Sequence, residues 1–181
     1  MILDATAGNR SMWQHKTSEN IIYLDIEKRL KHKPTIFADN TNTPFLSGIF
    51  DTIFYDPPHR WGGEPFEHGQ VSFLQKRQWA RTKPFAFTYY GWDKYKTRVS
   101  LIRHIYMAQK EFYRILKDDG VLWLKWNDCG IELRRVLTIF ADWTELMRLY
   151  IQDPTHTASE KQTYWVCLSK EKRDIKQTAL L

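Results

Sequence analysis

Short apolar runs alternate with polar or amphipathic stretches along the chain, and this alternation is typical of an α/β fold. The apolar runs predict strands at residues 2–5, 20–25, 35–39, 50–56, 121–126, 146–151 and 164–168. Only a polar turn around Asp153-Pro154 separates the last two. A direct connection of this kind joins antiparallel neighbours, so we expect a hairpin at one edge of the sheet.

Residues 98–117 are predicted to form a helix. Apolar side chains recur there on one predicted face, at Leu101, Ile105, Ala108, Phe112 and Ile115. The segment Asp118-Asp119-Gly120 is expected to end this helix, because glycine commonly follows the last helical turn. Residues 130–141 are predicted to be helical as well, and another helix is expected to open just after Gly8.

The length of 181 residues fits one domain covering 1–181. Two cysteines are too few for a disulfide framework or a zinc site, and no metal site is expected. No apolar run approaches the roughly 20 residues that span a bilayer. The N-terminal residues also lack the features of a signal peptide, so we expect a cytoplasmic protein without a membrane partner.

The first predicted strand runs into a short segment with one glycine, Gly8, and an acidic residue at the strand end, Asp4. In open α/β sheets a cofactor binds outside the carboxyl end of such a strand. A dinucleotide would require three glycines for its pyrophosphate, which argues against a nicotinamide cofactor. S-adenosylmethionine has no phosphates, and one glycine of close approach is enough for it, while Asp4 could accept from its ammonium group.

Two further acids follow at strand ends. Asp25 ends the second predicted strand, where a carboxylate can hold ribose hydroxyls, and Ile26 lies where an adenine ring would pack. Asp39 follows the third strand and could take the adenine amino group. Alternatively, these three acids only cap helices or end strands. The expected cofactor contacts are Asp4, Ala5, Thr6, Ala7, Gly8, Asn9, Asp25, Ile26, Ala38, Asp39 and Asn40.

Asp56-Pro57-Pro58-His59 follows the fourth predicted strand. An exocyclic amine donates its lone pair into its ring and is a poor nucleophile. Asp56 and the Pro57 carbonyl could accept the two amine hydrogens and free that lone pair, while the prolines stiffen the turn. The segment resembles the Asp/Asn-Pro-Pro-aromatic motif of enzymes that methylate adenine N6 or cytosine N4.

The resemblance also covers residues 4–8, 120–127 and 163–165. As a set, these segments resemble small S-adenosylmethionine-dependent methyltransferases of phages and mobile elements, which carry DPPH and KWN motifs. The likeness spans 1–58 and 100–169. It implies a Rossmann-like class I methyltransferase fold with a mostly parallel seven-stranded sheet, an antiparallel terminal hairpin, and catalytic residues Asp56, Pro57, Pro58 and His59.

His59 departs from the Tyr or Phe of the common motif, and this leaves the acceptor open. An imidazole could stack on a base that has been flipped out of its helix, or it could form a hydrogen bond or accept a proton. The acceptor could also be a small molecule or a protein side chain. A catalytically inactive nucleic-acid-binding module on the same fold is a further alternative.

Residues 60–98 carry a net charge of +5 out of the chain's +6, together with many aromatic residues. Basic side chains hold phosphates and aromatic rings stack on unpaired bases, so this segment is predicted to be a substrate lid or insertion for DNA or RNA. Alternatively, its rings pack into a small core of their own. The expected substrate contacts are Trp61, Arg77, Arg81, Lys83, Lys125 and Asn127. A homodimer, or a separate partner that supplies specificity, is also open.

Overall fold

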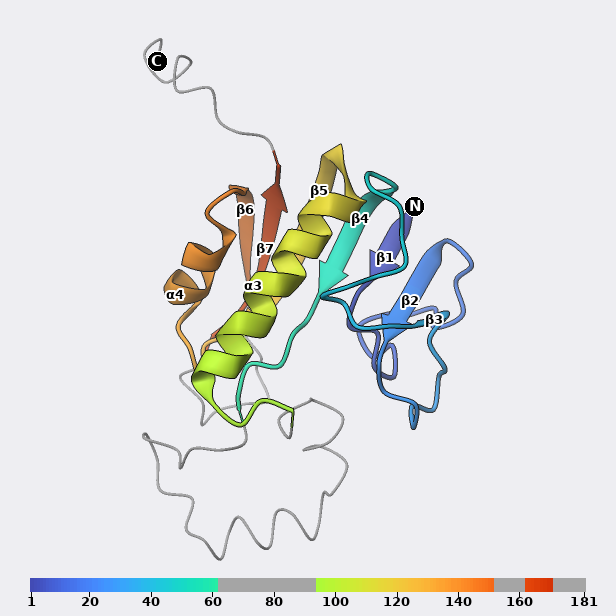
Figure 1. Cartoon of the computed structure of the whole chain (residues 1–181), viewed down its shortest axis with the longest axis horizontal. Helices are drawn as coiled ribbons and strands as arrows, with labels where there is room; N and C mark the ends of the chain where they lie inside the picture. Colours follow the sequence, from blue (N-terminus) through green and yellow to red (C-terminus); the bar gives the residue numbers. More distant parts are fainter. Residues whose placement is uncertain (62–93, 152–161, 171–181) are drawn as a thin grey trace, which may run out of the picture.

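The computed structural model describes residues 1–61, 94–151 and 162–170, and Figure 1 shows how their elements are arranged. The strands are β1 (Ile2–Asp4), β2 (Ile21–Asp25), β3 (Ile36–Phe37), β4 (Phe50–Tyr55), β5 (Leu116–Asn127), β6 (Thr144–Ile151) and β7 (Thr163–Ser169). They form one seven-stranded sheet in the order β3-β2-β1-β4-β5-β7-β6. Neighbours from β3 to β5 are parallel, while β7 is antiparallel to β5 and β6. The predicted mostly parallel sheet with an antiparallel terminal hairpin is confirmed.

The order of the strands reverses between β1 and β4. From β1 the chain proceeds outward to β2 and β3, and it then returns to the other side of β1 as β4. In register, Asp4 of β1 lies between Tyr23 of β2 and Phe54 of β4. In open sheets a ligand binds at the carboxyl ends of the strands, beside such a reversal. The fold therefore brings the segments after β1, β2 and β4 to one edge.

One face of the sheet is covered by α3 (Arg98–Ile115), with α4 (Leu133–Leu137) and the short 3₁₀ helix η1 (Thr138–Phe140) beside it. Thr97 and Ser100 cap α3 reciprocally, each side chain accepting from the other's backbone N–H. The predicted apolar stripe of this helix is confirmed, and its members are buried: Leu101, Ile105, Ala108, Phe112 and Ile115.

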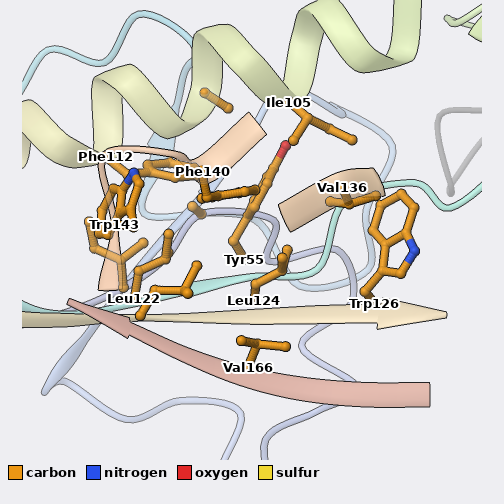
Figure 2. Packing of buried hydrophobic residues seen from close by; sticks show 14 of the residues in the cluster. Tyr55, Ile105, Phe112, Leu122, Leu124, Trp126, Val136, Phe140, Trp143 and Val166 are labelled. Atoms are coloured by element: carbon orange, nitrogen blue, oxygen red, sulfur yellow. The ribbon is translucent and has the colours of Figure 1, made fainter. Parts of the chain in front are cut away.

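The core under α3 anchors the end of β4. Figure 2 shows Tyr55, the last residue of β4, among side chains of α3 and β5. Its ring meets Phe112 edge to face, with centroids 4.8 Å apart, and both residues are fully buried. Burying the Phe112 side chain contributes about 1.5–3 kcal/mol. The residue that precedes Asp56 is therefore held rigidly.

The helix expected after Gly8 is absent, and the prediction was wrong. Gly8 and Arg10 both have positive φ, 49° and 57°, which a right-handed helix cannot contain. The guanidinium of Arg10 lies 3.8 Å from the centre of the Tyr23 ring and donates to the carbonyl oxygens of Lys16 and Lys33. These contacts fix a series of turns between β1 and β2 in place of a helix.

The end of α3 also differs from the prediction. The helix stops at Ile115, and β5 begins at the next residue, before Gly120. Regular pairing with β4 resumes at Val121, after a register shift. A Cβ on Gly120 would lie 2.8 Å from the Leu116 side chain and 3.0 Å from the carbonyl oxygen of Asp51. Glycine is needed here for close approach of the two strands and not to end a helix.

Most of the predicted lid, 62–93, lies outside the described residues, as does the predicted turn at Asp153-Pro154. The assignment of 1–181 to one domain, with 60–98 as a lid, therefore stays a prediction. Among the helices that the structure describes, none is long and apolar enough to cross a membrane.

Candidate active site

Hydrogen bonds join the loops at the carboxyl edge of the sheet into one unit. The backbone N–H of Asp56 donates to the Thr6 hydroxyl at 2.8 Å, which ties the segment after β4 to the segment after β1. The side-chain amide of Asn40 donates to the carbonyl oxygen of Ala5 at 3.1 Å, which adds the segment after β3. The predicted site residues of three strand ends thus lie together.

Asp56 lies between two cationic or potentially cationic groups. Its Oδ2 is 2.8 Å from the Lys125 ammonium, and its Oδ1 is 3.3 Å from Nε2 of His59. All three side chains are partly exposed, with 21%, 30% and 20% of their surfaces accessible, respectively. The carboxylate is therefore paired on both oxygens and still reachable from solvent.

These neighbours decide the charge of Asp56. Burial alone would raise the pKa of this carboxyl group. The hydrogen bond and charge of His59, together with the charge of Lys125, outweigh the burial and hold the pKa of Asp56 below its ordinary value. Asp56 is thus an ionised hydrogen-bond acceptor at neutral pH and a weak proton acceptor.

His59 is fixed on several sides. Its ring meets Trp126 edge to face, with centroids 5.0 Å apart. The Cys129 thiol lies 3.7 Å from the His59 carbonyl oxygen, and a Cβ on Gly130 would lie only 2.6 Å from the same oxygen. Nδ1 of His59 is buried and has no hydrogen-bond partner within the described ranges. The ring thus packs against Asp56 and Trp126, and its contact with Asp56 is in line with the hydrogen bonding that the sequence left open beside stacking and proton transfer.

The predicted substrate contacts have different surroundings in the structure. Lys125 pairs with Asp56, as described above. The side-chain amide of Asn127 donates to the Thr163 hydroxyl at 2.7 Å and accepts from the Cys129 N–H at 3.0 Å, so it fixes a turn. Trp61 packs against the main core. The predictions for Arg77, Arg81 and Lys83 lie outside the described residues.

Asp25 links the first two strand-end loops. Its Oδ2 accepts from the Gly8 N–H and its Oδ1 from the Glu27 N–H, both at 2.8 Å. The positive φ of Gly8, 49°, allows this close approach. Ile26 follows directly and exposes 47% of its surface. A partly buried carboxylate thus lies beside an exposed apolar side chain.

The segment after β3 contributes a capped acid and an unpaired amide oxygen. Asp39 accepts from the backbone N–H and hydroxyl of Thr41 at 2.9 and 2.8 Å. Burial raises its pKa, but these bonds outweigh the burial, so the pKa of Asp39 lies below its ordinary value. The Ala38 N–H donates to the Asp25 carbonyl at 3.3 Å. Oδ1 of Asn40 is buried without a partner among the residues that the structure describes.

Asp4, at the end of β1, is fully buried. Its Oδ2 accepts from the indole N–H of Trp13 at 2.7 Å, and its Oδ1 accepts from the Thr6 N–H at 3.2 Å. Burial raises the pKa of Asp4 to about 6, more than these two bonds lower it. Sequence reasoning missed Trp13, for which the only signal was a large aromatic residue in the polar loop after the glycine segment.

The remaining predicted residues of this loop have backbone roles. The Ala7 N–H donates to the Leu24 carbonyl at 3.0 Å, and the Asn9 side chain accepts from the Lys31 N–H at 2.8 Å. Their roles as cofactor contacts stay predictions. Within 1–61, 94–151 and 162–170, no cluster of three or more histidine, cysteine or acidic side chains could hold a metal ion.

No protein-family model matches the chain, and no curated protein sequence matches it. Solved structures share its fold. The PH0226 protein from Pyrococcus horikoshii OT3 aligns with a TM-score of 0.55 at 10% identity, over 94% of this chain and 81% of that one. Geranyl diphosphate C-methyltransferase from Streptomyces coelicolor A3(2), in complex with Mg²⁺, geranyl diphosphate and S-adenosyl-L-homocysteine, gives 0.53 at 10% identity over 94% and 70%. The fold described above is therefore one that methyltransferases use.

Proposed function

We propose that the chain is an S-adenosylmethionine-dependent methyltransferase acting on an exocyclic amine of a nucleic-acid base, adenine N6 or cytosine N4. One observation carries the proposal. The hydrogen bond from the Asp56 N–H to Thr6 brings the Asp56-Pro57-Pro58-His59 turn against the loop after β1. An acceptor site and a cofactor crevice would then share one edge of the sheet, beside its topological reversal.

The buried end of the crevice fits a cation. An ionised Asp4 has no cationic partner in the part of the chain that the structure describes, and burial disfavours its charge. The ammonium and sulfonium groups of S-adenosylmethionine would supply that missing positive charge. The indole of Trp13 covers the carboxylate and would have to move if a ligand is to touch it.

The outer part of the crevice fits an adenosine. A carboxylate has about four acceptor positions, so Asp25 keeps free ones for ribose hydroxyls after its two backbone bonds. The exposed Ile26 offers an apolar surface to a purine ring. The unpartnered Oδ1 of Asn40 is a ready acceptor for an amino group.

The cofactor and the protein would have different roles in the reaction. When bound, S-adenosylmethionine supplies an electrophilic methyl group on its sulfonium. Asp56 and the Pro57 carbonyl accept the hydrogens of the amine and draw its lone pair out of conjugation with the ring. The pKa of Asp56 lies below its ordinary value, so Asp56 acts as an acceptor of hydrogen bonds. The proton released from the methylated nitrogen would pass to solvent, which reaches the partly exposed Asp56 side chain. Pro57 and Pro58 keep the acceptors preorganised.

The choice of a nucleic acid is supported by charge and composition. Residues 60–98 directly follow the Asp56 turn and hold most of the chain's net positive charge, +5 of +6, interleaved with aromatic residues. This combination favours a single-stranded or flipped-out base with its flanking phosphates.

A panel assay tests the proposal. The protein is incubated with methyl-tritiated S-adenosylmethionine and DNA, RNA or protein, and the labelled polymers are digested for nucleoside mass spectrometry. We expect label in N6-methyladenine or N4-methylcytosine. Label confined to protein or to small molecules would contradict the proposed acceptor and leave the cofactor proposal standing. Binding of S-adenosylhomocysteine without any transfer would favour an inactive binding module.

A small-molecule acceptor is the second candidate. The observation that favours it is His59, which stands where the amino-methyltransferase motif has an aromatic ring for a base, and which packs against Asp56 and Trp126. Metabolite extracts added to the same assay would reveal such an acceptor.

A further inference from the structure

Lys125 reaches Asp56 because of the strand register. Tyr55 of β4 pairs with Leu124 of β5, so the residues that follow each of them lie side by side at the carboxyl edge. The resulting ion pair has an N–O distance of 2.8 Å. The ammonium thus points along the sheet edge at the carboxylate that would receive the acceptor amine.

The charges around Asp56 come from three elements. His59 faces it from its own turn, Lys125 from β5, and Asp4 from β1 as a like charge. His59 contributes a positive charge only when it is protonated. Lys125 contributes both a charge and a hydrogen bond to Asp56. An opposite charge at this distance favours the ionised carboxylate, and a like charge opposes it.

Ionisation and orientation both matter for the chemistry. A protonated carboxylic acid turns one oxygen into a donor, which would repel an amine hydrogen. An ionised carboxylate clamped by Lys125 at Oδ2 and His59 at Oδ1 still has a second acceptor position on each oxygen. The clamp therefore orients Asp56 without blocking it.

We propose that Lys125 is a positioning residue: it holds the Asp56 carboxylate ionised and in one orientation, and it does not itself bind the acceptor or its phosphates. This inference rests on the proposed function, since the orientation of Asp56 serves transfer only if an amine arrives there. It replaces the substrate contact that the sequence predicted for Lys125.

The protein contains a matched control. Asp51 and Lys117 form the same kind of pair between the same two strands, with an N–O distance of 2.6 Å, at the opposite and exposed end of β4. Lys117→Met removes an equivalent lysine from β5 without touching the site.

Carbon-13 NMR of the protein labelled at aspartate carboxyl carbons reads the charge of Asp56 without any turnover. The Asp56 signal is the one missing from Asp56→Asn, and Asp4 is followed as a separate signal. We expect the Asp56 titration midpoint to rise by about one pH unit in Lys125→Met, the effect of losing one adjacent charge. Lys125→Arg should restore it, and Lys117→Met should leave it unchanged. An unmoved midpoint in Lys125→Met would overturn the proposal.

The second test measures the rate of methyl transfer as a function of pH. The acid limb of the rate should move to higher pH with the Asp56 midpoint in Lys125→Met and return in Lys125→Arg, while the KM for the acceptor stays within about twofold. A raised KM with an unmoved acid limb would overturn the proposal and make Lys125 a substrate contact. A moved midpoint in a protein that methylates no nucleic acid would support the positioning role and refute the proposed acceptor alone.

Discussion

The indole N–H of Trp13 donates a 2.7 Å hydrogen bond to Oδ2 of Asp4 and closes over a carboxylate that solvent does not reach. Trp13 comes from the turns between β1 and β2, where a helix was expected, and its ring packs edge to face on Phe54 of β4. The edge of the sheet where the proposed cofactor would bind therefore holds a buried acid that has no cationic partner among the described residues. Two predictions concern this acid.

Asp4→Asn should stabilise the protein at pH 7.5 and not at pH 4. The pKa of Asp4 rises from 3.8 to about 6 on folding, so between these values the folded state holds a proton that the unfolded chain has lost. Stability consequently falls as pH rises through this window, by about 3 kcal/mol in total. Urea unfolding of both proteins at the two pH values measures the difference.

Asp51→Asn is the control, because its effect on stability near neutral pH should be opposite to that of Asp4→Asn. Its pairs with Lys117 and the N-terminal amine lower the pKa of Asp51 to about 2, so its contribution is present above the unfolded pKa and is lost as pH falls. Asp51→Asn should therefore cost stability at pH 7.5. A pH-independent effect of Asp4→Asn would contradict the charge assigned to Asp4.

Cofactor binding at pH 6 should release protons. A cationic ligand near Asp4 lowers the pKa of that carboxyl group, which is about half protonated at this pH in the free protein. Calorimetric titration with S-adenosylmethionine in two buffers of different ionisation enthalpy counts the protons released. Asp4→Asn should release none, and equal enthalpies in both buffers for the wild type would place the ligand's positive charge elsewhere.

Asp56→Ala should keep the fold and most of the cofactor affinity while losing about 10²–10³ in the rate of methyl transfer, because one preorganised acceptor is gone. Single-turnover methylation with enzyme in excess is the measurement, and Asp51→Ala, on the strand that leads to Asp56, is the control. His59→Ala should cost less if His59 only supports Asp56 or stacks. A comparable loss, with a wild-type rate that rises with pH through the imidazole range, would make His59 a general base. Near-normal transfer by Asp56→Ala would refute the mechanism.

Replacing Arg77, Arg81 and Lys83 by alanine should flatten the salt dependence of nucleic-acid binding. Each phosphate neutralised by a basic side chain releases counterions, so fewer basic contacts give a shallower slope of affinity against salt. Fluorescence anisotropy with a labelled single strand at several salt concentrations measures the slope. An unchanged slope would move the binding surface to another part of the chain.

Gly120→Ala should destabilise the protein by about 1–3 kcal/mol through crowding. Its Cβ would lie 2.8 Å from the Leu116 side chain and 3.0 Å from a main-chain oxygen of β4. The measurement is urea unfolding of the single and double variants with Leu116→Ala. If crowding against Leu116 is the cause, Gly120→Ala should cost less in the Leu116→Ala background. Strictly additive costs would place the crowding at the main-chain oxygen of Asp51 instead.

Periodicity and motif position were sufficient to predict the strands, the apolar stripe of α3 and the terminal hairpin. Each of these depends on residues close together in the sequence, such as the spacing of Leu101, Ile105 and Phe112. The same holds for the strand-end acids Asp4 and Asp56, because parallel strands place their carboxyl ends at one edge whatever their order. The prediction of a helix after Gly8 failed, because Gly8 and Arg10 have positive φ and the Arg10 guanidinium bonds to carbonyl oxygens 6 and 23 residues further along the chain, which local periodicity does not reveal.

What the sequence by itself determined is which chemical groups stand at the ends of which strands. Only the tertiary structure decided what each group contacts. Lys125 lies 69 residues from Asp56, and the pair exists because β5 adds beside β4 in one particular register. In the same way Trp13 meets Asp4 because the loop after Gly8 folds back over β1. Such contacts arise from long-range strand pairing and burial, which set side chains side by side irrespective of their separation along the chain.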